Sequence, residues 1–467
     1  MHLRQFHLEG LGHASYLVGD ERTGEALVLD PRRDIGAYLH EARDRGMRIA
    51  YVLDTHGHND YLSGVNELVA GVPGVQALAP ATGAYGYHHR PLAHGEVIEM
   101  GEISLEVLHT PGHTPEHVSL LVRDLSVSDE PAVLFSGGAL LVHDVARPDL
   151  LGGDDATRES ADAQLSTLRE RILTLPDHVE VYPTHVAGSL CGGAIGSRLS
   201  TTIGYERRTN PVIARALEGR PVDEVFGLAT LPAVPPYWRR MRAQNMAGPE
   251  VLGMVAEPPA LTVDLFAKLR EGGAVVLDTR RTEAFAGGHV PGALHVAIEG
   301  SFATWAGTVL PDGAETLLVL DRAEDLWEAT WQLLRIGYAP PAGWLVGGMQ
   351  GWRTTGMDVE SAAQLSVRQV AERLQDGSVR VLDVRQPDEW VQGHIEGATF
   401  MTGAEVPAEM GSLPPPDGRP LAVICGGGFR SSVIASLLVS LGREDAATVV
   451  GGMGAWRAEG LPVVRDG

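Results

Sequence analysis

The stretch THGHNDYLSG, residues 55–64, follows the apolar run 49–53 and decides how the first half of the chain is interpreted. A short apolar run that ends in a polar loop predicts a buried strand. His56, His58 and Asp60 stand at alternate positions directly after this strand. Neutral imidazole and carboxylate groups are the ligands that zinc and non-haem iron sites use. The stretch therefore predicts a metal site, and a pair of surface histidines beside a turn is the alternative.

Two later strands are also expected to end at histidines. His113 lies in the turn HTPGHTPEH, residues 109–117, and His185 lies in PTHVAGSLCGG, residues 183–193. Loops at the ends of strands are common positions for functional side chains. Because histidines close three separate strands, isolated structural roles explain the pattern poorly.

The pieces THGHND, TPGHT, ARPDLLG and PTHVAGSLCG occur in this order and resemble the branch of the metallo-β-lactamase superfamily that contains glyoxalase II and the persulfide dioxygenases. The resemblance covers residues 1 to about 245. It implies an αββα sandwich with a metal at one end of two packed sheets. Residue by residue, it implies a first metal site at His56, His58 and His113, and residues of a second site at Asp60 and His185.

Two positions depart from that family pattern. Tyr61 stands where the motif usually has its last histidine, which argues against a two-zinc hydrolase. Gly138 stands where the family has an aspartate ligand, and it offers no side chain to a metal. The expected cofactor is one Fe(II) per chain, held by histidines and water. Zinc in its place and a site without metal both stay open.

The composition excludes several classes of partner. The chain of 467 residues carries 60 acidic and 37 basic side chains, for a net charge of -23, so neither nucleic acid nor an anionic membrane is expected to bind. No apolar run is long enough to span a bilayer, and the N-terminal residues lack the apolar region of a signal peptide. Two cysteines cannot form a disulfide framework. We expect a cytoplasmic protein, and the sequence leaves a homo-oligomer open.

The second half contains an internal repeat. VVLDTRRTEAFAGGHVPGALHV, from Val275, pairs with VLDVRQPDEWVQGHIEGATFM, from Val381. Strands that alternate with helical patterns predict two α/β domains with parallel sheets. The D-x-R, GH and GGM pieces resemble the rhodanese family. The expected organisation is a metallo-β-lactamase-like domain at 1–245, a linker at 246–260, a rhodanese-like domain without a catalytic cysteine at 261–358 and a rhodanese domain with one at 363–467.

Cys425 opens the loop CGGGFRSS between the apolar run 421–424 and an expected helix at 433–441. The glycines after it let backbone N–H groups converge on an anion, the helix directs its positive end there, and an arginine adds a permanent cation. Such surroundings favour a thiolate that carries sulfur as a persulfide, whereas most free cysteines are buried small hydrophobes. The resemblance implies sulfur transfer on Cys425, with Gly426, Gly427, Gly428 and Arg430 as its loop.

The first copy has Asp321 where the second has Cys425, so we expect it to be a structural or docking module. The histidines of the two GH pieces, His289 and His394, are expected to be structural. Cys191 lies six residues after His185 in a glycine-rich turn, where a sulfur relay and simple packing are both open.

Taken together, these domains resemble the persulfide dioxygenase–rhodanese fusions of bacterial sulfide detoxification. That resemblance implies oxidation of a low-molecular-weight thiol persulfide, such as that of glutathione or bacillithiol, at a mononuclear iron. It also implies exchange of sulfur between Cys425 and thiosulfate or sulfite. The alternatives are a zinc thioester hydrolase fused to a sulfurtransferase, and a metal-poor scaffold domain with only the rhodanese active.

Overall fold

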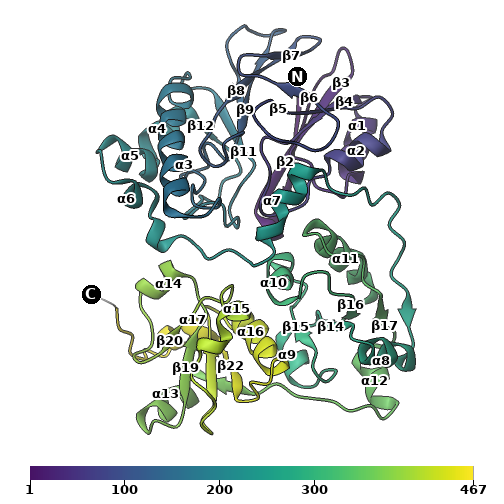
Figure 1. Ribbon diagram of the computed structural model, residues 1–467, viewed down its shortest axis with the longest axis vertical. Helices are drawn as coiled ribbons and strands as arrows, with labels where there is room; N and C mark the ends of the chain where they lie inside the picture. The colour runs from purple at the N-terminus through teal and green to yellow at the C-terminus, as the bar shows by residue number, and fades with distance from the viewer. Residues whose placement is uncertain (466–467) are drawn as a thin grey trace. The chain divides into compact units, whose positions relative to one another are not determined.

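The computed structural model describes residues 1–465, and these form two compact units (Figure 1). The first unit comprises residues 1–231 and 238–254, and the second comprises residues 232–237 and those from 255 onward. Among the described residues, no helix is long and apolar enough to cross a membrane.

The first unit contains two six-stranded sheets. One sheet has the order β1-β2-β3-β4-β5-β6 and the other has the order β12-β11-β10-β9-β8-β7. Their bounds are β1 His2–Leu8, β2 His13–Asp20, β3 Glu25–Leu29, β4 Arg48–Leu53, β5 Gln76–Pro80, β6 Arg90–Leu92, β7 Val97–Met100, β8 Ile103–His109, β9 Val118–Asp124, β10 Val133–Gly137, β11 Glu180–Pro183 and β12 Thr201–Thr202.

The strands have buried side chains on both faces, so these sheets lie in the middle of the unit. Tyr16 shares one buried cluster with Leu105 and Phe135 of the other sheet. Its neighbour Leu17 packs on the opposite face with Tyr38 of a covering helix. Successive side chains of a strand point to opposite faces, so a strand that is apolar at both positions must be covered on both.

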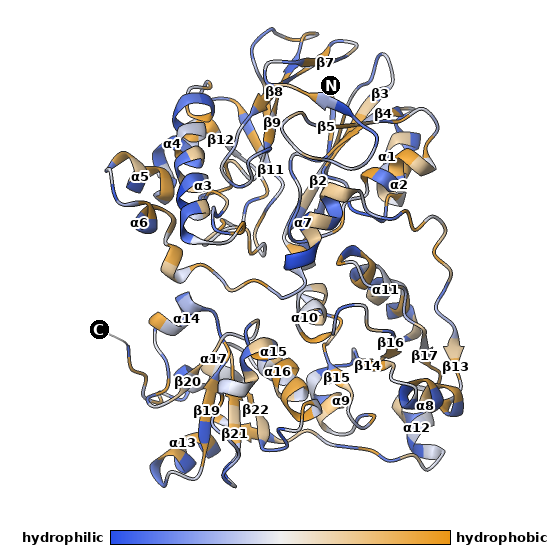
Figure 2. Ribbon diagram, viewed as in Figure 1, coloured by the Kyte–Doolittle hydropathy of each residue, from blue (hydrophilic) through white to orange (hydrophobic). Residues whose placement is uncertain are grey.

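Helices cover the outer faces of both sheets. Residues of α1 (Gly36–Asp44) and α2 (Val65–Gly71) pack on the first sheet, and residues of α3 (Asp154–Thr167), α4 (Ile203–Thr209), α5 (Pro211–Leu217) and α6 (Val222–Phe226) pack on the second. Much of α3 is hydrophilic, as expected for a helix with one face in water (Figure 2). The αββα sandwich predicted for this part of the chain is confirmed.

The second unit contains two five-stranded sheets with the same arrangement, β13-β17-β16-β14-β15 and β18-β22-β21-β19-β20. All pairs within them are parallel, which confirms the repeat and the fold class predicted for it. The strands are β13 Ala260–Leu261, β14 Val275–Asp278, β15 Leu294–His295, β16 Thr316–Val319, β17 Gly343–Leu345, β18 Gln364–Ser366, β19 Arg380–Asp383, β20 Thr399–Phe400, β21 Leu421–Ile424 and β22 Ala446–Val450.

Buried hydrogen bonds join the D-x-R and GH pieces in each copy. Arg385 donates to both carboxylate oxygens of Asp383, with its shortest bond at 2.6 Å, and also to the carbonyl of Gly393 at 3.0 Å. Arg280 makes the same bonds to Asp278 and Gly288. The arginine therefore ties the end of a central strand to the GH loop, and its charge is compensated although it is buried.

The helix after Cys425 differs from its prediction. It was expected over residues 433–441, whereas α16 spans Phe429–Ser440. Gly428 precedes it with φ 109°, a left-handed conformation that glycine adopts without steric cost. The helix therefore begins immediately after the glycines, and Arg430 belongs to its first turn.

Candidate metal centre and candidate sulfur-transfer site

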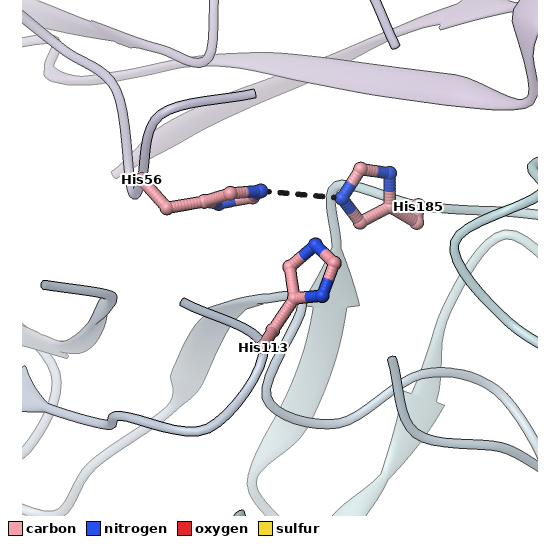
Figure 3. Close-up of side chains that lie close together, drawn as sticks. All are labelled: His56, His113 and His185. Carbon is pink, nitrogen blue, oxygen red and sulfur yellow. Dashed lines mark hydrogen bonds between the residues drawn. The ribbon is translucent and has the colours of Figure 1, made fainter. Parts of the chain in front are cut away.

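Three histidines that follow separate strands converge in the first unit. His56 follows β4, His113 follows β8 and His185 follows β11, and all three are buried. The Nε2 atoms of His56 and His185 lie 3.4 Å apart, and ligand atoms of all three residues lie within 4.8 Å of one another. Figure 3 shows the three rings directed at a common point. The structure thus brings together three of the five predicted ligands.

The opposite nitrogen of each ring has an oxygen partner. Nδ1 of His113 lies 3.0 Å from the carbonyl of Arg147, which can only accept, so this nitrogen carries the proton and Nε2 keeps its lone pair. Nδ1 of His56 lies 2.9 Å from Oγ1 of Thr55, whose hydroxyl donates to Asp30. Nδ1 of His185 lies 3.5 Å from a carboxylate oxygen of Asp60. Metal-binding histidines are oriented by such second hydrogen bonds.

These three residues fit a metal ion. Burial lowers the pKa of His56 and His113 well below the ordinary value of histidine, so both are neutral ligands. Nε2 of His113 is buried and has no hydrogen-bond partner among the described residues. A tetrahedral ion with bonds of about 2.0–2.1 Å to nitrogen separates its ligand atoms by about 3.3–3.4 Å. The spacing of His56 and His185 agrees with that value.

His58 lies beside this cluster, but its Nε2 donates to Asp30 at 3.1 Å. Burial opposes the charged form, yet Asp30 and its neighbours raise the pKa of His58 to about 9. Its other nitrogen, Nδ1, is buried and has no hydrogen-bond partner among the described residues, so the bond from Nε2 to Asp30 does not exclude a ligand role through Nδ1. That role stays a prediction.

Asp60 and Cys191 form a second group around His185, with ligand atoms within 4.8 Å of one another. Burial raises the pKa of the Cys191 thiol well above its ordinary value, and the nearby Asp60 adds to this shift. The thiol is therefore neutral and weakly nucleophilic in these surroundings. The sulfur-relay role of Cys191 stays a prediction.

The space around Gly138 is filled by histidines. A Cβ atom at Gly138 would lie 2.7 Å from Cδ2 of His113, and the Gly138 N–H donates to Nε2 of His117 at 2.8 Å. Nδ1 of His117 pairs with Oγ1 of Thr110 at 2.8 Å. His117 was missed by the sequence analysis, although its position in the HTPGHTPEH turn was a signal. Gly138 therefore lies against two buried histidines, His113 and His117.

Helix α7, Trp238–Ala247, fixes the histidine loop from the end of the first unit. Arg242 donates to both oxygens of Glu116 at 2.8 Å, and Glu116 accepts from the N–H of Gly57 at 2.9 Å. Asn245 donates to the carbonyls of His58 and Tyr61. The contacts of Arg242 with Glu116 and of Asn245 with the histidine loop span more than a hundred residues in sequence, and no local pattern predicted them.

Cys425 follows β21 at the floor of a cavity of about 760 Å³ in the second unit. Its Sγ accepts from the N–H of Gly428 at 3.1 Å and lies 3.5 Å from Oγ of Ser431. Arg430 makes two bonds to Glu389, at 2.6 and 2.7 Å. The structure thus brings the predicted loop around the sulfur, and it adds Glu389 as a partner that the sequence analysis missed.

The first copy has Asp321 at the corresponding position. Asp321, Arg322 and Asp325 line a second cavity of about 440 Å³, which shares Arg281, Ala297 and Glu299 with the cavity of Cys425 and has no cysteine among its described lining residues. The first copy therefore lacks the nucleophile of the second.

Residues 8–185 match the Metallo-beta-lactamase superfamily, and residues 262–355 and 366–459 match the Rhodanese-like domain. The chain belongs to the metallo-β-lactamase superfamily and continues into two rhodanese-like domains.

The chain is similar to particular members of these families. Persulfide dioxygenase ETHE1, mitochondrial, of Bos taurus is 30% identical over 210 residues, which are 44% of this chain and 72% of the bovine protein. A hydroxyacylglutathione hydrolase of Polaromonas is 36% identical over 179 residues, 37% of this chain and 61% of that protein. A crystal structure of a metallo-beta-lactamase from Staphylococcus aureus is 31% identical with a TM-score of 0.65, and covers 74% of this chain and 98% of its own. The predicted combination of a persulfide dioxygenase-like domain with tandem rhodanese domains is confirmed.

Proposed function

We propose that this chain is an enzyme of sulfur metabolism that oxidises a low-molecular-weight thiol persulfide in its first unit and transfers sulfur on Cys425 in its second. The observation that carries the first half is the convergence of three buried Nε2 atoms from His56, His113 and His185. The similarity to persulfide dioxygenases supports the choice of substrate.

His56, His113 and His185 would hold the metal, for which we propose one Fe(II) per chain. When bound, iron supplies the one-electron chemistry that activation of O₂ requires. The overall oxidation balances as R–S–SH + O₂ + H₂O → R–SH + SO₃²⁻ + 2 H⁺. The terminal sulfur is oxidised and O₂ is reduced.

The protein side of this reaction follows from the charges of the ligands. An imidazole bound to a metal carries no charge, so three of them do not compensate the charge of a divalent ion and the loaded centre stays cationic. A cationic centre favours an anionic persulfide over a neutral thioester. The hydrogen bonds of His56 to Thr55 and of His113 to Arg147 hold these two rings in place, and a carboxylate oxygen of Asp60 lies 3.5 Å from Nδ1 of His185.

In the second unit, Cys425 would carry the transferred sulfur. The exchange Cys425–S–S⁻ + SO₃²⁻ → Cys425–S⁻ + S₂O₃²⁻ breaks one S–S bond, forms another and needs no external oxidant. The N–H of Gly428 already donates to Sγ, and helix α16 directs its positive end toward it. Cys425→Ser should abolish thiosulfate:cyanide sulfurtransferase activity; retained activity would refute the assignment.

Oxygen uptake tests the first half. Iron-loaded protein mixed with glutathione persulfide should consume O₂ and release sulfite in equal amounts. His113→Ala should lose both while sulfur transfer continues. Hydrolysis of S-D-lactoylglutathione without O₂ uptake would instead support the zinc hydrolase, which the similarity to hydroxyacylglutathione hydrolase favours. If the protein showed neither O₂ uptake nor hydrolysis, the first unit would be a scaffold.

A further inference from the structure

The cavity above Cys425 is walled by both rhodanese copies. Its lining includes Arg430 and Phe429 from the second copy, and Arg281, Glu299 and Trp305 from the first. The copy without a cysteine therefore forms one side of the candidate sulfur-transfer site.

This wall is anchored to the helix that follows Cys425. Trp305, from α10 (Phe302–Val309), meets Phe429 edge to face, with ring centroids 6.4 Å apart. It packs so closely on Gly403 that a Cβ there would lie 2.7 Å from the indole ring. His295 pairs with Oγ of Ser432 at 2.9 Å and its N–H donates to Ser436 at 3.0 Å. The first copy thus holds α16 through buried polar and aromatic contacts.

The charges that remain available in the cavity belong to the first copy. Arg430 is bound through two hydrogen bonds to Glu389, so its charge is compensated within the second copy. Arg281 and Glu299 lie 3.7 Å apart with side chains 75% and 72% exposed, and Glu283 lies on the same wall. An exposed pair of this kind contributes little, so both partners are free to exchange it for a ligand.

The size and mixed charge of the cavity indicate an organic substrate. A cavity of about 760 Å³ has the volume of sites for drug-sized molecules, and thiosulfate alone would leave most of it to water. One cationic and two anionic side chains on the same wall match a ligand that carries both a carboxylate and an ammonium group.

We propose that the first rhodanese copy is the recognition half of the Cys425 site. Arg281 binds the carboxylate of a zwitterionic thiol, and Glu283 or Glu299 binds its ammonium group. The proposal rests on sulfur transfer at Cys425. The step is Cys425–S–SH + R–SH → Cys425–SH + R–S–SH: the S–S bond at Cys425 breaks, a new one forms on the acceptor sulfur, and the acceptor proton passes to Cys425.

Acceptors of defined charge test this role. With thiosulfate as donor, transfer would be measured to glutathione, 3-mercaptopropionate, cysteamine and 2-mercaptoethanol. Arg281→Gln should raise the KM for glutathione and 3-mercaptopropionate by about fivefold, which corresponds to roughly 1 kcal/mol. The KM for cysteamine and 2-mercaptoethanol, and kcat for all four, should not change. Glu283→Gln with Glu299→Gln should raise the KM for glutathione and cysteamine, which carry an ammonium group, and leave that for 3-mercaptopropionate unchanged.

Arg322→Gln is the matched control. Arg322 belongs to the same copy, its side chain is 70% exposed, and it lines the cavity of Asp321 rather than that of Cys425. It should leave every KM unchanged. An Arg281→Gln variant that behaves like this control, or that weakens all four acceptors equally, would overturn the recognition role while sulfur transfer stands. No transfer by the unaltered protein would overturn the proposed function itself.

Discussion

At the scale of single residues, the candidate metal centre depends on hydrogen bonds that direct lone pairs. The carbonyl of Arg147 determines which nitrogen of His113 is protonated, and Thr55 does the same for His56. Asp30 accepts from Nε2 of His58, and Nδ1 of that ring has no partner among the described residues. Neutral His56 and His113 therefore lie close to a charged His58.

Gly138→Asp should not restore a carboxylate ligand. The new Cβ would meet the ring of His113 at 2.7 Å, so the ring must shift or the loop must move. We expect a loss of bound metal and a destabilisation of about 1–3 kcal/mol, typical of overpacking. Elemental analysis and thermal unfolding check this. Gly36→Ala, where no atom lies within 4 Å of the added Cβ, is the control. Higher metal content in Gly138→Asp would contradict the account.

The sequence predicted the convergence of the histidines but not their individual partners. His56, His113 and His185 could be recognised because each directly follows a strand, and strands of packed sheets end together. The pairing of His58 with Asp30 could not be predicted, since Asp30 comes from a different strand end and the alternation of His56 and His58 fits either outcome. The same holds for Glu389, which is 41 positions from Arg430.

At the scale of elements, the loop before α16 places backbone groups around the sulfur of Cys425. Gly428 has φ 109° and donates its N–H to Sγ of Cys425. The start of α17 (Gly452–Ala458) supports the loop: the N–H of Met453 donates to the carbonyl of Cys425 at 2.7 Å, and the N–H of Gly454 donates to that of Gly426 at 2.9 Å. The GGM piece, which occurs in both copies, therefore supports this loop in the second copy.

Alanine substitutions at two neighbouring glycines distinguish the effect of backbone strain from the effect of an added side chain. Gly428→Ala forces a left-handed residue with a side chain, which costs about 1–3 kcal/mol and should move the N–H away from Sγ. Gly427→Ala, where no atom lies within 4 Å of the added Cβ, should have little effect on the fold. Sulfurtransferase rates of both variants check this. Equal rates would show that the conformation of Gly428 is not required.

The contact between β15 and α16 should be sensitive to acid. Burial lowers the pKa of His295, against the weaker opposite effects of its bond to Arg280 and of Asp278. A histidine whose pKa is lower in the folded state makes its full contribution to the free energy of unfolding above about pH 6.5. This contribution is lost as the pH falls, because the unfolded state then binds more protons than the folded state. Unfolding in denaturant at pH 5.0 and 7.5 measures it. His295→Gln should show a smaller difference between the two pH values than the unaltered protein; an equal difference would contradict the assignment.

The sequence also predicted the repeated α/β domains, because the D-x-R and GH pieces recur after 105 residues and the GGM piece after 104. It misplaced the start of α16, since three glycines and two serines have low helix propensity and the expected helix began only after them. The structure starts the helix at Phe429 because the positive φ of Gly428 closes the loop there.

At the scale of the whole molecule, the chain combines two chemistries in separate units. The candidate metal centre uses residues of the first unit, and the cavity of Cys425 is lined by residues of the second. Among the described residues the two sites share no side chain, so each should survive the loss of the other. The second unit in turn devotes one copy to the nucleophile and, in our proposal, the other to recognition.

The metal content of the purified protein tests the central claim most directly. The protein should be expressed with iron in the medium and without a chelating tag, then measured by elemental analysis beside His113→Ala and Cys425→Ser. We predict about one iron per chain in the unaltered protein and in Cys425→Ser, and none in His113→Ala. A folded protein without metal, two zinc ions per chain, or iron that persists in His113→Ala would contradict the assignment of His56, His113 and His185 as an iron site.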